Sequence, residues 1–393
     1  MSSIRTPGVY VKEITSLPPS VEEVKTSVPA FIGYTEKAEE LAADDLRFIP
    51  HKITSLMEYK KWYGVAGTTA AFILYHSMEL YFANGGGDCY IVSIGGYNNN
   101  QQIADFIKGL DAINKIDEPT LLLFPDAVNL PGNDLYDVQK AALNQAANLG
   151  DRFCILDLKF ADTNNKHADV VSEFRRNIGN DRLKFGAAYT PYLKVTIGST
   201  IVLPPSAAIA GVYCSVDNAR GVWKAPANVS LNMINEVAYT IDNNEQDNLN
   251  VDLNEGKSIN AIRKFTGHGI LIWGARTLAG NDNEWRYISV RRFFIMVEES
   301  VKKSCMPFVF EPNIAATWVR MKSMIENYLL EKWREGALAG ARPEDAFFVQ
   351  IGLGQTMTAQ DVLEGKIIVQ IGMAAVRPAE FIIINFSIKM QEG

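Results

Sequence analysis

The sequence has little of what most catalytic and metal sites require. It contains only four cysteines and four histidines in 393 residues. Cys89, Cys154, Cys214 and Cys305 are far apart, and no Cys-x-x-Cys pair occurs. This spacing argues against a zinc site and against a disulfide scaffold. We therefore expect buried thiols in a reducing cytosol, and no metal ion.

Motifs for nucleophilic or nucleotide chemistry are also missing. His51 and His167 are expected at the surface, His76 in an apolar helix and His268 in a glycine turn. The sequence contains no Gly-x-Ser-x-Gly elbow. The glycines at 85–87 lack the Gly-Lys-Ser/Thr of a phosphate loop, and Gly352 and Gly354 are a lone pair. The sequence predicts no catalytic residue and no cofactor.

Charge and hydropathy exclude two further classes of partner. The net charge is −7, from 38 basic and 45 acidic residues, which does not favour direct binding to nucleic acid. No apolar run reaches the roughly 18 residues of a membrane span. Residues 1–10 lack the pattern of a signal peptide. We expect synthesis in the cytosol and no direct contact with a membrane.

The middle of the chain alternates between amphipathic and short apolar segments. Helices are expected at residues 101–114, 134–149 and 167–178, and buried strands at 119–124 and 152–157. Such alternation predicts an α/β fold with a mainly parallel sheet. At this length we expect two or three subdomains.

The later part is less regular. Residues 242–255 are polar and acidic and are expected to form a loop. Residues 308–310 and 347–351 are expected to be strands. The longest helix is expected at residues 314–334, with Asn313 as its N-cap.

Both ends of the chain have strand-like patterns. Near the start, Val9, Tyr10, Val11 and Ile14 form a short apolar strand that prolines follow. Near the end, residues 366–376 and 380–390 are β-rich and flank Arg377-Pro378-Ala379. In the second of these runs one face carries Ile382, Ile384, Phe386 and Ile388. A terminal apolar strand must be buried in its own sheet or in that of a neighbour.

Charged residues gather in residues 283–292 and along the long helix. The helix carries Arg320, Lys322, Glu326, Glu331, Lys332 and Arg334. Two interpretations stay open: a solvated face with i,i+4 ion pairs, or an interface that breaks and reforms.

Several segments together resemble one family. They are Pro7-Gly-Val-Tyr-Val11, Pro204-Pro-Ser-Ala-Ala-Ile-Ala-Gly211, Asn218-Ala-Arg-Gly-Val-Trp223, Gly274-Ala-Arg-Thr-Leu278, Trp285-Arg-Tyr-Ile-Ser-Val-Arg-Arg292, Phe310-Glu-Pro-Asn313 with Trp318, and Arg377-Pro-Ala-Glu380. They are similar, in the same order, to the contractile tail sheath proteins of phages, R-type pyocins and extracellular contractile injection systems.

The resemblance implies a structural subunit that is not an enzyme. It implies stacked hexameric rings around an inner tube, with contraction from a metastable extended state to drive the tube through a target membrane. The implied partners are other copies of the chain, the inner tube protein, and baseplate and terminator or cap proteins. Assembly is expected in the cytoplasm, as part of a phage tail or of a tail-like particle that can be released.

The resemblance also assigns the segments of the chain. An N-terminal arm (1–28) precedes an outer α/β domain (29–278) of subtilisin-like layout without catalysis. An inner, tube-facing mixed α/β domain (279–365) and a C-terminal β arm (366–393) follow. In this family such arms complete sheets in neighbouring subunits. Within the inner domain, the long helix is the candidate tube contact, through Arg320, Lys322 and Lys332. Two alternatives remain at this stage: a static tube or shell protein, and an α/β hydrolase.

Overall fold

The computed structural model describes residues 20–67, 72–161, 166–197 and 199–381. Contacts divide the chain into two bodies. We call residues 23–300 with 375–381 the large body, and residues 301–374 with 20–22 the small body. The division falls inside one helix, between Ser300 and Val301, whereas the predicted inner domain begins at residue 279. The predicted four-segment division remains a proposal about the assembled protein.

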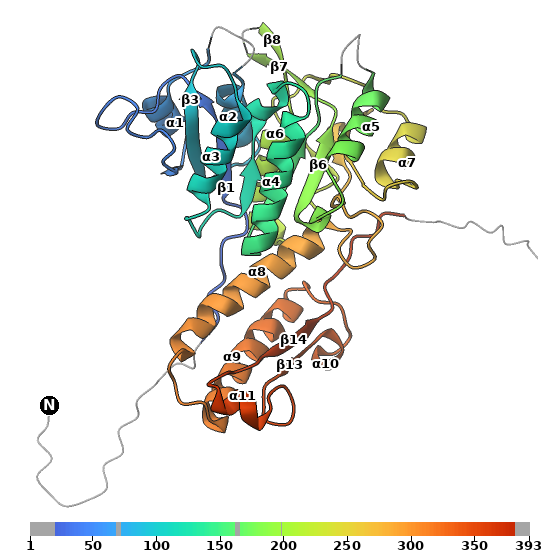
Figure 1. Ribbon diagram of the computed structural model, residues 1–393. Helices are drawn as coiled ribbons and strands as arrows, with labels where there is room; N and C mark the ends of the chain where they lie inside the picture. The colour runs from blue at the N-terminus through green and yellow to red at the C-terminus, as the bar shows by residue number, and fades with distance from the viewer. Residues whose placement is uncertain (1–19, 68–71, 162–165, 198, 382–393) are drawn as a thin grey trace, which may run out of the picture. The chain divides into compact units, whose positions relative to one another are not determined.

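A nine-stranded sheet forms the centre of the large body (Figure 1), in the order β2-β3-β1-β4-β5-β6-β11-β12-β9. The strands are β1 (Pro29–Thr35), β2 (His51–Ile53), β3 (Cys89–Gly96), β4 (Leu121–Leu123), β5 (Phe153–Asp157), β6 (Gly186–Thr190), β9 (Val229–Ser230), β11 (Asn260–Phe265) and β12 (Gly269–Trp273). The six strands from β3 to β11 pair in parallel, and β2, β12 and β9 pair antiparallel. The predicted mainly parallel α/β fold is confirmed.

Helices cover the sheet because its central strands are apolar on both faces. The helices are α1 (Leu56–Tyr63), α2 (Leu74–Ala83), α3 (Ile103–Ile113), α4 (Asp134–Leu149), α5 (His167–Asn177), α6 (Ser206–Arg220) and α7 (Asn243–Asn250). Helix α3 packs against α4, and α2 packs against α6. Strands β7 (Leu193–Ile197), β8 (Ser199–Leu203) and β10 (Glu236–Val237) form a second, antiparallel sheet. Helix α8 (Ile288–Cys305) crosses the division between the two bodies.

The small body is built on one helix and one hairpin-like sheet. Helix α9 (Ala315–Arg334) packs against β13 (Phe347–Gln350), which pairs antiparallel with β14 (Gln370–Met373). The short helices α10 (Pro343–Ala346) and α11 (Ala359–Leu363) complete it. The buried face of α9 carries Met321, Met324, Ile325, Tyr328 and Leu329. Within the described residues this sheet has two strands.

Three predictions of secondary structure or helix capping were wrong. Residues 308–310 are not a strand: Met306–Phe308 is a 3-10 turn, and Phe310 has a left-handed backbone with φ 70°. The polar stretch from Asp242 contains α7, because Asp242 and Glu245 form a capping box. Asn313 does not cap α9, since Ile314 is the N-cap residue and the Asn313 amide oxygen accepts from Trp318 Nε1.

Candidate interaction sites

The predicted arm residues lie outside the described part of the chain. These are Val9, Tyr10, Val11 and Ile14 at the N-terminus and Ile382, Ile384, Phe386 and Ile388 at the C-terminus. The segments that connect them to the large body are described. We call residues 23–28 the N-terminal root and residues 375–381 the C-terminal root.

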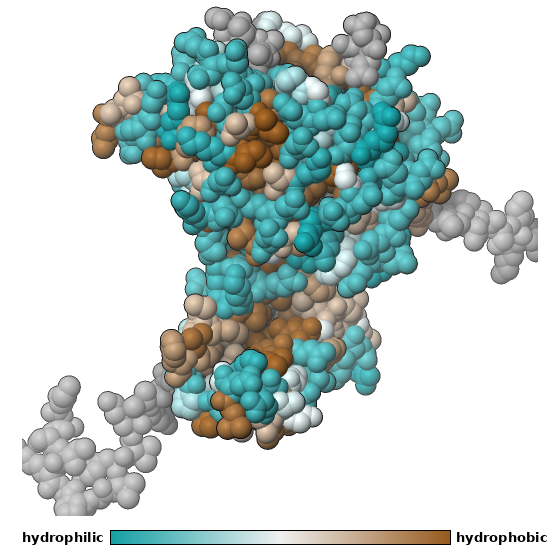
Figure 2. All heavy atoms as spheres, in the orientation of Figure 1, coloured by the Kyte–Doolittle hydropathy of each residue, from teal (hydrophilic) through white to brown (hydrophobic). Residues whose placement is uncertain are grey.

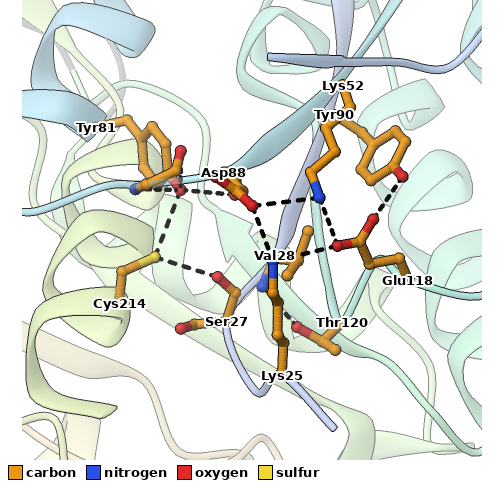
Figure 3. Close-up of polar contacts among 11 residues, drawn as sticks. Lys25, Ser27, Val28, Lys52, Tyr81, Asp88, Tyr90, Glu118, Thr120 and Cys214 are labelled. Atoms are coloured by element: carbon orange, nitrogen blue, oxygen red, sulfur yellow. Dashed lines mark hydrogen bonds and ion pairs between the residues drawn. The ribbon is translucent and has the colours of Figure 1, made fainter. Parts of the chain in front are cut away.

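The N-terminal root is hydrogen-bonded along its length to the rest of the large body (Figure 3). The Val28 N–H donates to Thr120 Oγ1 at 2.9 Å, and that hydroxyl donates to the Thr26 carbonyl at 2.8 Å. The Thr120 N–H donates back to the Val28 carbonyl at 2.9 Å. The Cys214 thiol lies 3.4 Å from the Ser27 carbonyl, and the Val24 N–H donates to Ser300 Oγ. The root is therefore a fixed extended segment that leads into β1, inside the sheet.

Lys25 of this root belongs to a cluster of four charged side chains (Figure 3). Its ammonium group lies 2.8 Å from Asp88 and 3.4 Å from Glu118, and Lys52 lies 3.2 Å and 2.6 Å from the same carboxylates. The Tyr90 hydroxyl also donates to Glu118. The hydrogen bond from Lys25, with a further one from Lys52, holds the pKa of Asp88 below its usual value. These groups are partly exposed, so the cluster adds only modest stability.

A buried ion pair lies next to the root. Arg292, on α8, places Nη1 3.0 Å and Nη2 2.5 Å from the two carboxylate oxygens of Asp217, on α6. Both side chains are only 3% exposed. The pair is also hydrogen-bonded to the root. Thr26 Oγ1 donates to Asp217 at 2.6 Å, and Arg292 Nη2 donates to the Thr26 carbonyl at 3.0 Å. A solvated helix face is therefore the wrong interpretation for Arg292.

The C-terminal root has its own buried arginine. Arg276 Nε lies 2.9 Å and Nη2 2.5 Å from the two carboxylate oxygens of Glu380, and Tyr287 Oη donates to the same carboxylate. Arg276 is 4% exposed and Glu380 15%. Neither partner was singled out as a site residue, although Arg276 and Glu380 both lie in segments that carry the family resemblance. Their sequence separation of 104 residues hides the pairing.

The three predicted tube-contact residues do not share one surface. Arg320 is 54% exposed and pairs with Glu311 at 2.9 Å, and Lys322 is 40% exposed and pairs with Glu326 at 3.7 Å. Lys332 is 8% exposed and donates to Glu335. Its position follows Tyr328 by four residues and Leu329 by three, which places it on the packed face of α9. Only Arg320 and Lys322 are available for an outside contact.

The sequence analysis did not predict the exposed apolar side chains of the small body. Around the corner between α8 and α9 they are Met306, Val309, Phe310, Ile314 and Val319. The Phe310 side chain is fully exposed. Its backbone lies in the left-handed region, which is strained for a bulky residue. Brown, hydrophobic atoms are visible on this body in Figure 2. An apolar surface of this kind is typical of an interface.

The edge of the sheet where α/β enzymes bind ligands is filled by the chain itself. At the carboxyl ends of β4 and β5 lie Asp126 and Asp157, both fully buried. Asp126 accepts N–H bonds from Tyr34, Ile73 and Leu74, and Asp157 accepts one from Ser206. Burial raises the pKa of each carboxyl to about 7. Asp126 therefore connects β1 to the start of α2, and Asp157 binds the start of α6.

His167 and His268 lie in different environments. His167, predicted at the surface, is buried and bonds Thr190 Oγ1 at 2.8 Å, while its ring stacks on Tyr239. His268 is exposed in its turn. In the described ranges no group of three or more His, Cys, Asp or Glu side chains is placed to hold a metal ion. None of the helices described is long and apolar enough to cross a membrane.

Comparisons with known proteins agree on one family. Residues 280–389 match the phage tail sheath C-terminal domain. A chain of the anti-feeding prophage (AFP) baseplate structure is 36% identical with a TM-score of 0.76, covering 99% of this chain and 100% of that one. A chain of the contracted PVC sheath complex, from an extracellular contractile injection system, is 35% identical with a TM-score of 0.76, covering 98% of both chains.

A curated relative gives a more distant match. The tail sheath protein of Salmonella phage ViI is 25% identical over 139 residues, which are 35% of this chain and 21% of that protein. The full-length matches are to sheath polymers and baseplate assemblies of contractile particles. The chain therefore belongs to the contractile tail sheath protein family and is a contractile sheath subunit.

Proposed function

We propose that the chain polymerises as stacked hexameric rings around an inner tube, and that the rings contract from a metastable extended state to drive the tube through a target membrane. The two-stranded sheet of the small body carries this proposal. Such a sheet is marginal by itself, and the outer edges of β13 and β14 have no strand partner within the described residues. Open edges of this kind accept strands from other chains.

The donated strands are the two arms. Val9, Tyr10, Val11 and Ile14 of one copy, and Ile382, Ile384, Phe386 and Ile388 of another, would extend the β13–β14 sheet of a neighbour. Main-chain ladders survive a rigid-body rotation of subunits because the arms act as hinges beyond the fixed roots. Contraction then exchanges one set of subunit contacts for another, and it needs no hydrolysis and no cofactor in this chain. A gain of a few kcal/mol in each subunit is summed over many copies.

Deleting residues 1–20 tests the arm directly. The truncated chain is expected to keep its folded bodies, because the large body begins at residue 23 and the small body loses only Ser20 of its described residues. It is expected to remain monomeric where the full chain forms sheaths, since one donated strand is missing. Sedimentation and negative-stain electron microscopy measure both properties. Sheaths built by the truncated chain would contradict the proposal.

Contraction is tested by the geometry of the polymer. Two discrete diameters and pitches in electron micrographs of purified particles are expected for a contractile sheath, and one for a static tube. Assembly is proposed to take place in the cytoplasm, with baseplate and terminator proteins at the ends of the polymer. The particle is a phage tail or a related injection system.

The inner tube is proposed to contact the exposed side of α9 through Arg320 and Lys322. Charge reversal in Arg320→Glu with Lys322→Glu is expected to reduce the amount of tube protein that co-sediments with the sheath by about tenfold, the effect of roughly 1.4 kcal/mol. Lys194→Glu, which breaks the exposed Lys194–Glu236 pair of the large body, is the matched control. Equal recovery of tube in both variants would remove α9 from the tube interface.

A further inference from the structure

The roots of both arms are held by arginines that belong to one short segment. Arg276 binds the C-terminal root at Glu380, and Arg292 binds the N-terminal root at Thr26. We propose that residues 275–292, which we call the bridge, join the two roots mechanically and carry the tension between subunits during contraction. This inference rests on the proposed role of the arms as links between copies.

The bridge is closed on itself by short-range backbone pairing. Arg276 and Tyr287 form an antiparallel β-bridge. The Thr277 N–H donates to the Arg286 carbonyl at 2.8 Å, and the Ile288 N–H donates to the Ala275 carbonyl at 3.0 Å. Helix α8 begins at Ile288 and carries Arg292 in its second turn. The two arginines are therefore connected by a loop whose two ends are hydrogen-bonded to each other, and by the first turns of α8.

The bridge is also fixed to the central sheet. The buried Asn260 side chain, at the start of β11, accepts from the Arg276 N–H and donates to the Arg276 carbonyl, both at 2.8 Å. The same amide donates to the Ala188 carbonyl of β6. Gly274 leaves the necessary room, because a Cβ there would lie 2.7 Å from Asn260 Oδ1. A force on either root therefore acts on a segment that is tied to the sheet. Moving this segment would break the hydrogen bonds between Arg276 and the Asn260 side chain.

Each root is held by a charged group out of water. Hydrogen bonds between ionised partners are stronger than neutral ones, and separation would leave a buried charge without its partner. At the C-terminal root the contact is a paired arginine–carboxylate interaction. At the N-terminal root the Arg292–Asp217 pair grips both the hydroxyl and the carbonyl of Thr26. Such contacts suit segments that must stay attached while the arms beyond them turn.

Two conservative variants separate attachment from folding. Glu380→Gln removes the negative charge of the C-terminal root at nearly constant shape. Thr26→Val removes the hydroxyl bond to Asp217 and keeps the buried Arg292–Asp217 pair. Glu364→Gln, which weakens the exposed Glu364–Lys366 pair, is the control. In the full-length chain, hydrogen–deuterium exchange of residues 375–381 in Glu380→Gln and of residues 23–28 in Thr26→Val is expected to become at least tenfold faster, with exchange of the central strands unchanged.

The same variants are then assembled with the particle's other proteins and triggered to contract. The double variant Thr26→Val/Glu380→Gln is expected to give at least tenfold fewer unbroken contracted sheaths than the control. Looser roots with intact sheaths would overturn the bridge as a path for tension, and unchanged exchange would overturn the anchors themselves. A wild-type chain that forms no polymer would instead refute the proposed function, and with it the mechanical role of the bridge.

Discussion

Substituting Asp217 with alanine is expected to lower the free energy of unfolding of the large body by about 3–5 kcal/mol, because Arg292 would remain buried without its counter-ion. The loss is large since the two side chains share two hydrogen bonds and are almost completely withdrawn from water. It also releases the Thr26 hydroxyl from its acceptor. Urea unfolding followed by tryptophan fluorescence measures the change.

A double variant shows whether the loss comes from the unpaired charge. In Arg292→Met/Asp217→Leu both charges are replaced by apolar side chains of comparable size, and most of the lost stability is expected to return. The contacts with Thr26 would still be missing, so the fold recovers while the root stays loose. A loss below about 1 kcal/mol for Asp217→Ala, within the range of exposed pairs, would contradict the burial argument.

Periodic and capped elements could be predicted from the sequence alone. Helix α4 has its predicted bounds, because an amphipathic stripe leads to Gly150, whose φ of 77° ends the helix. Helix α5 ends one residue before its predicted bound of 178, and its buried face carries Val170, Val171 and Phe174. In both cases local chemistry and burial agree.

Predictions failed where the local sequence pattern and the surrounding structure disagree. The apolar residues 308–310 have strand-like composition, but Pro307 and Pro312 flank them and Phe310 is left-handed. Helix α7 has one buried residue, Leu249, so its apolar periodicity is weak. Its capping box from Asp242 to Glu245 was the signal that could have found it.

The site was harder to predict than the fold because its contacts are distant in sequence. The charges of residues 283–292 stand out in the sequence, but Arg292 pairs with Asp217, which lies 75 residues away. Periodicity indicates which face of a helix is apolar and does not indicate which buried ion has a partner. Lys332 illustrates the same limit, since its long stem lies on the packed face of α9 while its ammonium group reaches Glu335.

The stability of the large body is expected to fall as the pH rises from about 5 to 7. Asp126 and Asp157 are buried with pKa values raised to about 7, against 3.8 for an ordinary aspartate. In that pH window the unfolded chain has lost both protons and the folded chain retains them, so each group removes about 1.4 kcal/mol of stability per pH unit. Burial lowers the pKa of His167, and its contribution has the opposite sign. Burial raises the pKa of Asp151 as well, so the raised carboxyls outnumber the one lowered imidazole and the net slope is downward.

Asp157→Asn is the variant that isolates this effect. Its amide oxygen can still accept from the Ser206 N–H, whereas an amide at position 126 would turn a donor toward one of three N–H groups. Urea midpoints of the wild type are expected to decline between pH 5 and 7, and those of Asp157→Asn to decline less steeply, because one of the carboxyls that keeps its proton in the folded chain is removed. A wild-type midpoint that rises over this range would mean that these carboxyls are already ionised in the folded chain. The N–H groups around them would then outweigh burial, and the filled carboxyl edge of the sheet would be held by charge rather than by neutral acids.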